Sequence, residues 1–466
     1  MAELHQLSAA ELLALYAARE VSPLEATRAV IAHIQAWEPH LRATYAFDPE
    51  GALAQARASE TRWLRSQAQG ALDGVPTLLK ENIATKGVPM PLGTAATELV
   101  PAAEDAPPAA RLREAGAVLL GKTTTPEFGC KGETNSPLTG ITRNPWNPAK
   151  TPGGSSGGTA AAVAAGMGPL SVGTDGAGSV RIPAAFCGNF GLKPSFGRVP
   201  AYPLSPFGSV AHLGPHTMSV ADAALMMTVL AQPDARDWTA LPPDGRDYAV
   251  GLNDGVRGLR IAYSPTLGYA RNVDPEVAAA VERAVRDLEA LGAVVEAVDP
   301  GFADPLDITT GLWFLGAWMV WNTLTPEQQA LADPDFAAEA ELGRAFSALQ
   351  IQQLQLRRGA LGSHLRQFMQ RFDLIATPAV SVPAFEARPA GHSPLSPETM
   401  LGWTPFSYPF NLSQQPAATI PCGLTAGGLP IGLQLVGPMF GDALVLRACR
   451  AYESLRPIAR PGLGWA

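Results

Sequence analysis

Cysteine is scarce in this sequence, and its placement does not suggest metal or disulfide chemistry. The four cysteines, Cys130, Cys187, Cys422 and Cys449, are scattered over 466 residues without a C-x-x-C pair. Zinc motifs and small disulfide scaffolds rely on closely spaced cysteines, and the sequence suggests neither. We therefore expect buried free thiols.

Positive charge is also in short supply. The chain has 34 Lys and Arg against 42 Asp and Glu, a formal net charge of −8, and no basic run. This balance argues against a nucleic-acid partner. No stretch approaches the roughly twenty apolar residues of a membrane helix. The first residues, interrupted by Glu3, Glu11 and Glu20, lack the basic start and apolar core of a secretory signal. A cytoplasmic, soluble protein without a membrane partner is expected.

What the chain does contain indicates one large globular domain. Hydrophobic residues make up 47% of the sequence, no linker or repeat divides it, and strand-like and helix-like stretches alternate in its second half. Ser8 and Ser22 each precede helical apolar spacing and have Glu11 and Glu25 three residues later, which predicts capped helices over 8–19 and 22–37. We predict an α/β fold with a mixed central β-sheet covered by helices on both faces. Further expected helices are 49–66, 158–166, 220–230, 275–291, most of 305–370, and 442–455; expected strands are 43–47, 75–83, 117–120, 258–263, 293–298, 373–377 and 432–436; 200–215 is expected to be rich in loop.

One motif match is predicted to be false. Residues 116–123 read GAVLLGKT, which fits the phosphate-loop pattern GxxxxGK[ST]. A phosphate loop needs a strand before its first glycine and a helix after its lysine. Here the apolar residues 117–120 between the glycines are themselves the predicted strand, and Pro126 follows soon after.

Glycine and serine are concentrated between residues 153 and 197. Two loops, GGSSGG at 153–158 and GTDGAGS at 173–179, flank an alanine-rich segment that predicts a short helix. Glycine is favoured where the backbone takes positive φ or where amides approach another atom closely. We interpret this stretch as the active-site module, with Ser155 and Ser179 brought together across one helix.

These residues resemble the amidase signature family, and the resemblance covers nearly the whole chain. The motifs that carry it are LDGVPTLLKENI at 72–83, LGKTTTPEFG at 120–129, TRNPWNP at 142–148, the module with VRIPAAFCGNFGLKPSFGRV at 180–199, and QQPAATIPCGLTAGGLPIGLQLVGP at 414–438. The resemblance implies a single amidase domain over 1–466. Within it we distinguish an N-terminal helical layer (1–70), an amidase signature core (71–230) and a variable helical region at the substrate pocket (300–370).

The resemblance also implies a Ser-Ser-Lys triad. Ser179 matches the nucleophile, Ser155 the bridging serine whose preceding peptide is cis in the family, and Lys80 the base. A lysine acts as a base only when neutral, and burial beside Leu78, Leu79 and other apolar residues is expected to lower its pKa. The expected reaction passes through an acyl-enzyme on Ser179 and needs no metal or cofactor.

The second glycine-serine loop is expected to bind the oxyanion. Consecutive backbone amides at Gly176, Ala177, Gly178 and Ser179 can form a nest around a developing negative charge. We expect Asp175 and Arg181 to support this loop rather than to join the chemistry. Ser156 is interpreted as a turn-stabilising hydroxyl.

A histidine-based triad is the main alternative. None of the seven histidines lies in the module, and the nearest, His212 and His216, fall in the expected loop beyond it. A catalytic histidine must be oriented by a carboxylate. We therefore interpret both as loop or pocket residues.

Three positions depart from the family pattern without removing a triad residue. Glu81 stands where aspartate is common, and Met218 where arginine is usual. Gly176-Ala177 replaces the commoner Thr-Gly pair, and the methyl group of Ala177 narrows the oxyanion loop.

The substrate is less well defined than the mechanism. Gly129 and Cys130 occupy the stretch that lines the acyl pocket in relatives. Aromatic residues at helical spacing are more often core than pocket. If some of them line the pocket, the substrate is a bulky apolar or aryl amide, a carbamate (urethane), or a lactam-like oligomer rather than free glutamine. The aromatic residues in question are the cluster at 313–321, Trp403, Phe406 and Tyr408.

Three functional classes stay open. The first is a stand-alone amidase acting on a small-molecule amide, with esterase activity as a side reaction. The second is the amidase subunit of a tRNA-dependent amidotransferase that works with partner chains, although 127–137 (EFGCKGETNSP) lacks the FAMGSSTE-like run expected there. The third is a catalytically silent scaffold, disfavoured by the presence of Lys80, Ser155 and Ser179. A homodimer is left open.

Overall fold

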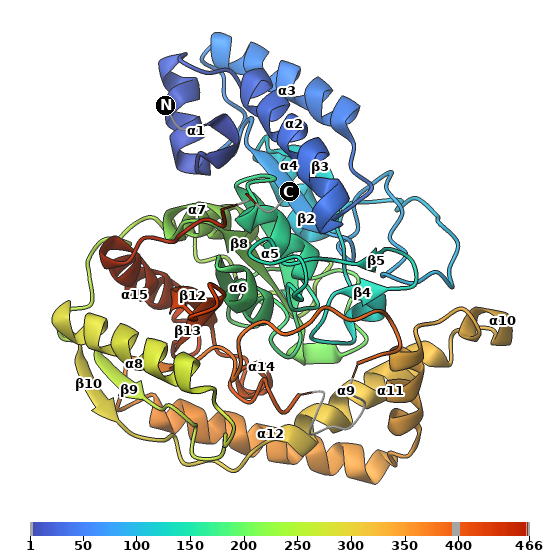
Figure 1. The fold of residues 1–466 in the computed structure, drawn as a ribbon, viewed down its shortest axis with the longest axis vertical. Coiled ribbons are helices and arrows are strands. Elements are labelled where there is room, and N and C mark those ends of the chain that lie inside the picture. Colours follow the sequence, from blue (N-terminus) through green and yellow to red (C-terminus); the bar gives the residue numbers. More distant parts are fainter. Residues whose placement is uncertain (1–2, 394–400, 463, 465–466) are drawn as a thin grey trace.

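An eleven-stranded mixed sheet runs through the computed structural model, which describes residues 3–393, 401–462 and 464 (Figure 1). The strand order is β1-β3-β2-β6-β8-β7-β12-β13-β11-β9-β10. Strands β4 (Asn135–Ser136) and β5 (Gly140–Ile141) form a separate small sheet. The large sheet comprises β1 (Thr44–Tyr45), β2 (Pro76–Lys80), β3 (Val118–Thr123), β6 (Leu170–Asp175), β7 (Phe190–Lys193), β8 (His212–Thr217), β9 (Arg260–Tyr263), β10 (Val294–Ala297), β11 (Leu374–Pro378), β12 (Ala417–Leu424) and β13 (Pro430–Val436).

Parallel and antiparallel pairs alternate in blocks along the sheet. Strands β3, β2 and β6 are parallel neighbours, and so are β11, β9 and β10. Between these blocks, β6, β8, β7, β12, β13 and β11 pair in antiparallel fashion. The mixed central sheet expected from the sequence is confirmed.

Helices cover both faces of the sheet because successive strand residues point in opposite directions. In β2, Leu79 joins the core cluster that contains residues of α7, α8 and α15, whereas Leu78 packs with the alanines of α5. In β13, Leu433 belongs to the first face, and Gly432 lies under α6, where an added Cβ would be 2.8 Å from the Cβ of Ala185. The helices are α1 (Ala9–Ala18), α2 (Pro23–Leu41), α3 (Pro49–Leu64), α4 (Pro107–Glu114), α5 (Gly157–Ala164), α6 (Arg181–Cys187), α7 (Val220–Leu230), α8 (Pro275–Ala290), α9 (Leu306–Trp321), α10 (Pro326–Gln329), α11 (Pro334–Arg344), α12 (Ala348–Phe368), α14 (Pro409–Leu412) and α15 (Asp442–Leu455), with short 3-10 turns η1 (Leu4–Gln6), η2 (Glu127–Gly129) and η3 (Gly208–Val210).

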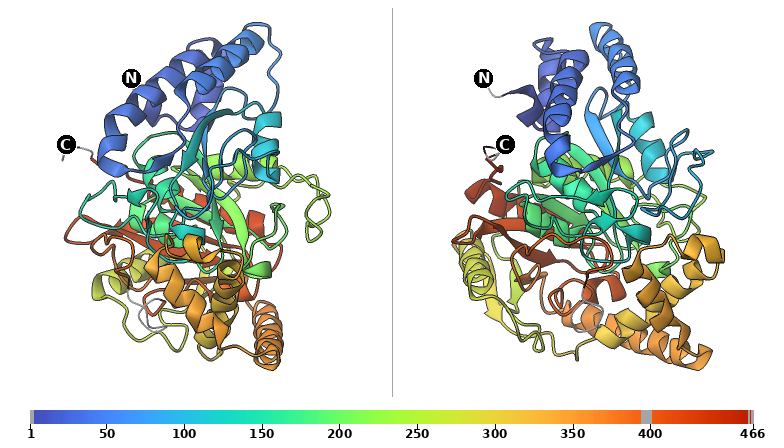
Figure 2. Two further views of the ribbon diagram at one scale, coloured as in Figure 1. Left: turned by 90° about the vertical axis from the view of Figure 1, so that its right-hand side faces the viewer. Right: turned by 45° about the vertical axis from the view of Figure 1, so that its right-hand side comes forward.

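Two helical layers lie at opposite ends of the sheet. Helices α1 to α3 gather at the β1 end, and α9 to α12 lie at the other end, below the core in Figures 1 and 2. Helices α1 and α2 begin at the predicted serines: Ser8 and Ser22 accept from the amides of Glu11 and Glu25, and both capping boxes are complete. The first layer therefore follows from local sequence alone.

Several strands were not expected. Strands β6 and β7 lie inside the glycine-serine module, and β12 inside the C-terminal motif, and the sequence predicts no strand at either place. The expectation of loop over 200–215 is wrong at its end, because β8 begins at His212 and pairs with β6 and β7. Small and proline-rich strands such as β8 do not show the apolar alternation on which strand prediction depends.

The GAVLLGKT segment is not a phosphate loop. Strand β3 runs through Lys122, which is buried and donates from Nζ to the carbonyl of Glu81 at 2.7 Å. No helix follows this lysine directly. The predicted false match is confirmed.

In the part of the chain that the structure describes, no helix combines the length and the apolar character needed to cross a bilayer.

Candidate active site

Lys80 lies at the carboxyl end of β2 and is completely buried. It shares the face of Leu78, so its side chain points toward α5. Its Nζ donates to Ser155 Oγ at 2.6 Å and to Thr174 Oγ1 at 2.9 Å. The sheet thus brings a lysine and a serine from distant parts of the sequence into direct contact, as the resemblance implied.

The pKa of Lys80 is lowered from 10.5 to about 7. Burial is the main cause, because an ammonium group loses hydration when it leaves water. The carboxylates of Asp175 and Glu81 oppose this effect and raise the pKa, but burial prevails. A substantial fraction of Lys80 is therefore neutral near pH 7 and able to accept a proton, as a general base must.

Ser155 and Ser179 stand at the starts of two neighbouring helices. Ser155 lies two residues before α5, and the Gly154–Ser155 peptide is cis, as the resemblance implied. Ser179 lies two residues before α6 and is 6% exposed. The Ser156 amide donates to the Ser179 carbonyl at 3.1 Å, which ties the two loops together. Both Ser155 and Ser179 line one cavity, and within the described residues the Ser179 hydroxyl has no hydrogen-bond partner.

Thr174 and Asn82 are two site residues that the sequence analysis missed. Thr174 Oγ1 accepts from both Lys80 Nζ and Asn82 Nδ2, the latter at 3.1 Å. Their signal was present, since Thr174 belongs to the GTD motif and Asn82 follows Lys80 by two residues. Ser156 Oγ donates to the Thr174 carbonyl at 3.0 Å and accepts from its amide at 3.2 Å. The interpretation of Ser156 as a turn-stabilising hydroxyl is confirmed.

The loop before Ser179 presents some, but not all, of the expected amides. The Gly178 amide donates to Asp175 Oδ1 at 2.8 Å, so it is engaged within the loop rather than free for an oxyanion. This differs from the expectation, because the Asp175 carboxylate folds back over its own turn. Within the described residues, the amides of Gly176, Ala177 and Ser179 donate to no other group. These three are the available donors.

Asp175 and Arg181 support the loop, as expected. Arg181 is fully buried and binds both carboxylate oxygens of Asp175, from Nε and Nη2, each at 3.0 Å. Burial alone would raise the pKa of Asp175, but the Arg181 guanidinium outweighs this and lowers it far below its usual range. Ser407 Oγ donates to the Ala177 carbonyl at 2.7 Å and fixes the other side of the loop.

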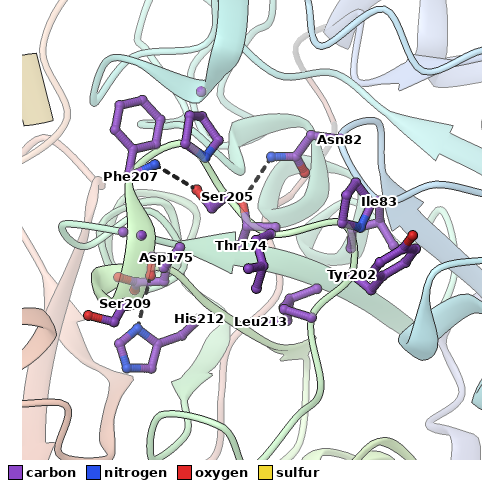
Figure 3. Close-up of a pocket in the computed structure, with 18 of the residues that line it drawn as sticks. Asn82, Ile83, Thr174, Asp175, Tyr202, Ser205, Phe207, Ser209, His212 and Leu213 are labelled. Carbon is purple, nitrogen blue, oxygen red and sulfur yellow. Dashed lines mark hydrogen bonds between the residues drawn. The ribbon is translucent and has the colours of Figure 1, made fainter. Parts of the chain in front are cut away.

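A cavity of about 320 Å³ opens beside these residues (Figure 3). Its lining is mostly apolar, and none of the described lining residues is Lys or Arg. Its walls come from the segment after β2, from the 195–213 segment, and from α9. Tyr202, Leu204 and Trp238 belong to this lining and are well exposed, Trp238 at 80%, so they stand where the cavity meets solvent.

Of the two predicted acyl-pocket residues, only Gly129 lines the cavity. A Cβ added to Gly129 would lie 3.3 Å from Ser155 Oγ. The expectation for Cys130 is wrong: its side chain is turned away and packs with Ala317, Phe336 and Ala340, outside the described lining. The cause is that α9 and α11 form an apolar layer behind the loop.

The aromatic residues divide in the same way. Trp313 lines the cavity, whereas Trp318 and Trp321 pack around Phe336 in the cluster that also holds Cys130. Phe406 and Tyr408 are buried in core clusters, and Trp403 stacks on Phe186 with ring centroids 5.5 Å apart. For most of these residues the core interpretation holds.

His212 and His216 lie on β8, not in a loop. His212 lines the cavity, and its Nδ1 is 2.7 Å from the Val210 carbonyl oxygen; His216 Nδ1 is 3.2 Å from Asn189 Oδ1. Burial is the main cause that lowers both pKa values, to about 3 for His216. Neither ring is oriented by a carboxylate side chain among the described residues, so the geometry of a histidine triad is missing.

Among residues 3–393, 401–462 and 464, no group of three or more His, Cys, Asp or Glu side chains is arranged to hold a metal ion.

The comparisons with known proteins agree on one family. The sequence profile described as Amidase matches residues 25–446. The chain is 37% identical over 463 residues to the acylamidase of Rhodococcus erythropolis, covering 98% of this chain and 97% of that protein. It is 36% identical over 481 residues to the amidase subunit of the glutamyl-tRNA(Gln) amidotransferase of Chloroflexus aurantiacus, covering 98% of each. A solved bacterial aryl acylamidase of the amidase signature enzymes superposes with a TM-score of 0.90 at 32% identity, covering 97% of each chain.

The chain therefore belongs to the amidase signature family. It is a single-domain enzyme that hydrolyses amide bonds.

Proposed function

We propose that the chain is a stand-alone amidase that hydrolyses bulky apolar or aryl amides through a Ser-Ser-Lys triad. The observation that carries this proposal is the contact between the buried Lys80, whose pKa is lowered to about 7, and Ser155 at the wall of an apolar cavity that also holds Ser179. A lysine with this pKa in direct contact with a cavity serine has the properties of a general base.

The proton moves along the two serines. Neutral Lys80 accepts the proton of Ser155 Oγ, and Ser155 accepts that of Ser179 when the free Ser179 hydroxyl turns toward it. Ser179 Oγ then attacks the amide carbon and forms a C–O bond. Contacts of this kind are often loose in a free enzyme and tighten with bound substrate.

The oxyanion loop and the relay complete the reaction. The amides of Gly176, Ala177 and Ser179 stabilise the tetrahedral oxyanion. The C–N bond breaks, the leaving amine takes a proton that returns from Lys80 through Ser155, and the acyl group stays on Ser179. Water loses a proton to the same relay and attacks the acyl carbon. The acid leaves, and Ser179 regains its hydrogen.

The cavity favours an apolar substrate over glutamine. The α-carboxylate of glutamine calls for a cationic partner, and the described lining offers neither Lys nor Arg. The relatives named acylamidase and aryl acylamidase support an aryl or bulky acyl amide. Aryl carbamates and lactam-type oligomers belong to the same apolar class and are included in the substrate panel below.

The amidase subunit of an amidotransferase is the second candidate, favoured by the relative from Chloroflexus aurantiacus. Such an enzyme would release ammonia from glutamine or asparagine and work with partner chains. It predicts that the purified chain alone leaves aryl amides intact and that glutamine hydrolysis appears with partner subunits.

The test is release of the arylamine from aryl amides and aryl carbamates by the purified chain alone, with a chelator present, alongside lactam oligomers and glutamine. Ser179→Ala is expected to reduce turnover by about 10⁴-fold or more, as loss of a nucleophile does. Ser454→Ala, on α15, is the matched control and should retain activity. Equal activity of the native chain and Ser179→Ala would overturn the assignment of Ser179.

A further inference from the structure

One cavity residue contacts the oxyanion loop directly from the variable helical region. Trp313, on α9, lines the cavity and is 7% exposed. Its ring stacks on Phe207 with centroids 3.8 Å apart and an angle of 8° between the planes. Phe207, labelled in Figure 3, comes from the segment before β8, so two distant parts of the chain form one aromatic wall.

The indole of Trp313 is held at a third point. Its Nε1 donates to the Cys130 carbonyl at 2.9 Å. Cys130 follows Gly129, which lies beside Ser155. A buried indole N–H with a partner and a stacked face has little freedom to rotate. The ring therefore has one defined position relative to the catalytic serines.

That position depends on the absence of a side chain at Gly176. A Cβ added there would lie 2.7 Å from Cζ3 and 3.1 Å from Cη2 of Trp313. Carbon atoms do not approach this closely without displacing one another. The family pattern commonly has threonine at this position, so in this chain the indole ring takes the space that the threonine side chain would fill.

We propose that Gly176 and Trp313 form a matched pair that shapes an aromatic subsite beside the oxyanion loop and selects substrates with a flat aryl group. The proposal rests on the proposed amidase function. The stacked Trp313 and Phe207 rings supply the apolar contact, and Gly176 lets the indole reach the loop. Trp313 thus determines specificity, and Gly176 positions it.

The test uses Trp313→Leu, Gly176→Ala and the double variant, with Trp318→Leu as the matched control. Trp318 is on the same helix but packs away from the cavity. Substrates are acetanilide and benzamide, which place the aryl group on the nitrogen and on the carbonyl, and acetamide as the small reference. The readout is the ratio of kcat/KM for each aryl amide to that for acetamide.

Trp313→Leu is expected to lower this ratio for at least one aryl amide by about tenfold, the loss expected when an aromatic contact is removed. Trp318→Leu should leave the ratio unchanged. Gly176→Ala should lower aryl activity strongly in the native background and only weakly in the Trp313→Leu background, because the clashing ring is gone. A ratio unchanged by Trp313→Leu for both aryl amides, or equal effects of Gly176→Ala in both backgrounds, would overturn the proposal.

Melting temperatures of the same variants separate this proposal from the proposed function. Gly176→Ala is expected to lower the melting temperature when Trp313 is present and not when it is leucine. If the native chain cleaves no amide, the amidase proposal and the substrate selection that rests on it fail together, and the melting temperatures still decide whether the residues are paired. If it cleaves aryl amides through Ser179 and the Trp313→Leu ratio is unchanged, only the specificity proposal fails.

Discussion

Replacing Lys80 by methionine is expected to stabilise the protein at low pH while abolishing its activity. Methionine keeps a long unbranched side chain but carries no charge. The pKa of Lys80 is about 7 in the folded protein and 10.5 as the reference for the unfolded chain. Folding near neutral pH therefore removes a proton from this lysine or buries its charge, and either event costs free energy.

The magnitude follows from the two pKa values. Because the folded pKa is the lower one, the unfolded chain binds more protons between about pH 7 and 10.5, and stability rises with pH across that window. The full lowering corresponds to about 5 kcal/mol of stability lost at pH 6, of which about 2 kcal/mol is still lost at pH 9. Methionine forfeits two hydrogen bonds, to Ser155 and Thr174, of about 1 kcal/mol each. Lys80→Met should therefore gain about 3 kcal/mol at pH 6 and almost nothing at pH 9.

Urea denaturation of both proteins at pH 6 and pH 9 measures this difference. Its change with pH, about 3 kcal/mol, does not depend on the value assigned to the lost hydrogen bonds. Lys150→Met is the control, because Lys150 is partly exposed and pairs with Glu386. A stability difference that stays constant with pH would show that the pKa of Lys80 is not lowered by folding and would refute the reasoning.

Three further predictions concern the same site. The kcat/KM for an aryl amide should rise with pH through an apparent pKa of about 7, since only neutral Lys80 is a base; a profile flat between pH 5 and pH 9 would contradict this. Gly129→Ala should lower kcat about tenfold by crowding Ser155, whereas Gly87→Ala, also at positive φ but with open space around it, should leave kcat unchanged in steady-state assays. Arg181→Met should lower the free energy of unfolding by about 3–5 kcal/mol, because the buried Asp175 carboxylate loses its partner; urea denaturation showing no loss would count against this role.

Local chemistry in the sequence was enough for several elements. The two capping boxes place α1 and α2, because each needs only a serine and a glutamate three residues apart. The amphipathic pattern before the last strands places α8 within one residue of its end, and α7 and α15 match their predicted bounds. The motifs around Lys80, Ser155 and Ser179 placed the chain in its family.

Other features depend on contacts between distant segments. Strands β6, β7, β8 and β12 are rich in small residues and proline, and they pair because their neighbours in the sheet complete their hydrogen bonds. The Gly178 amide looked available because the turn was considered alone, whereas the orientation of the Asp175 carboxylate is set by Arg181 from the next helix. Cys130 looked like a pocket residue because no local pattern reveals the layer that α9 and α11 build behind it.

The sequence by itself determined which side chains are available for chemistry: one lysine in an apolar strand, two serines in glycine-rich loops, and the motifs around them. Only the tertiary structure decided their state. The pKa of Lys80 depends on complete burial by neighbouring strands and helices, and its contact with Ser155 depends on adjacent β2 and β6. Likewise, Gly176 leaves room that a tryptophan from α9 fills. Burial and close contact are properties of segments far apart in the chain, so they arise only when the sheet and its helices assemble.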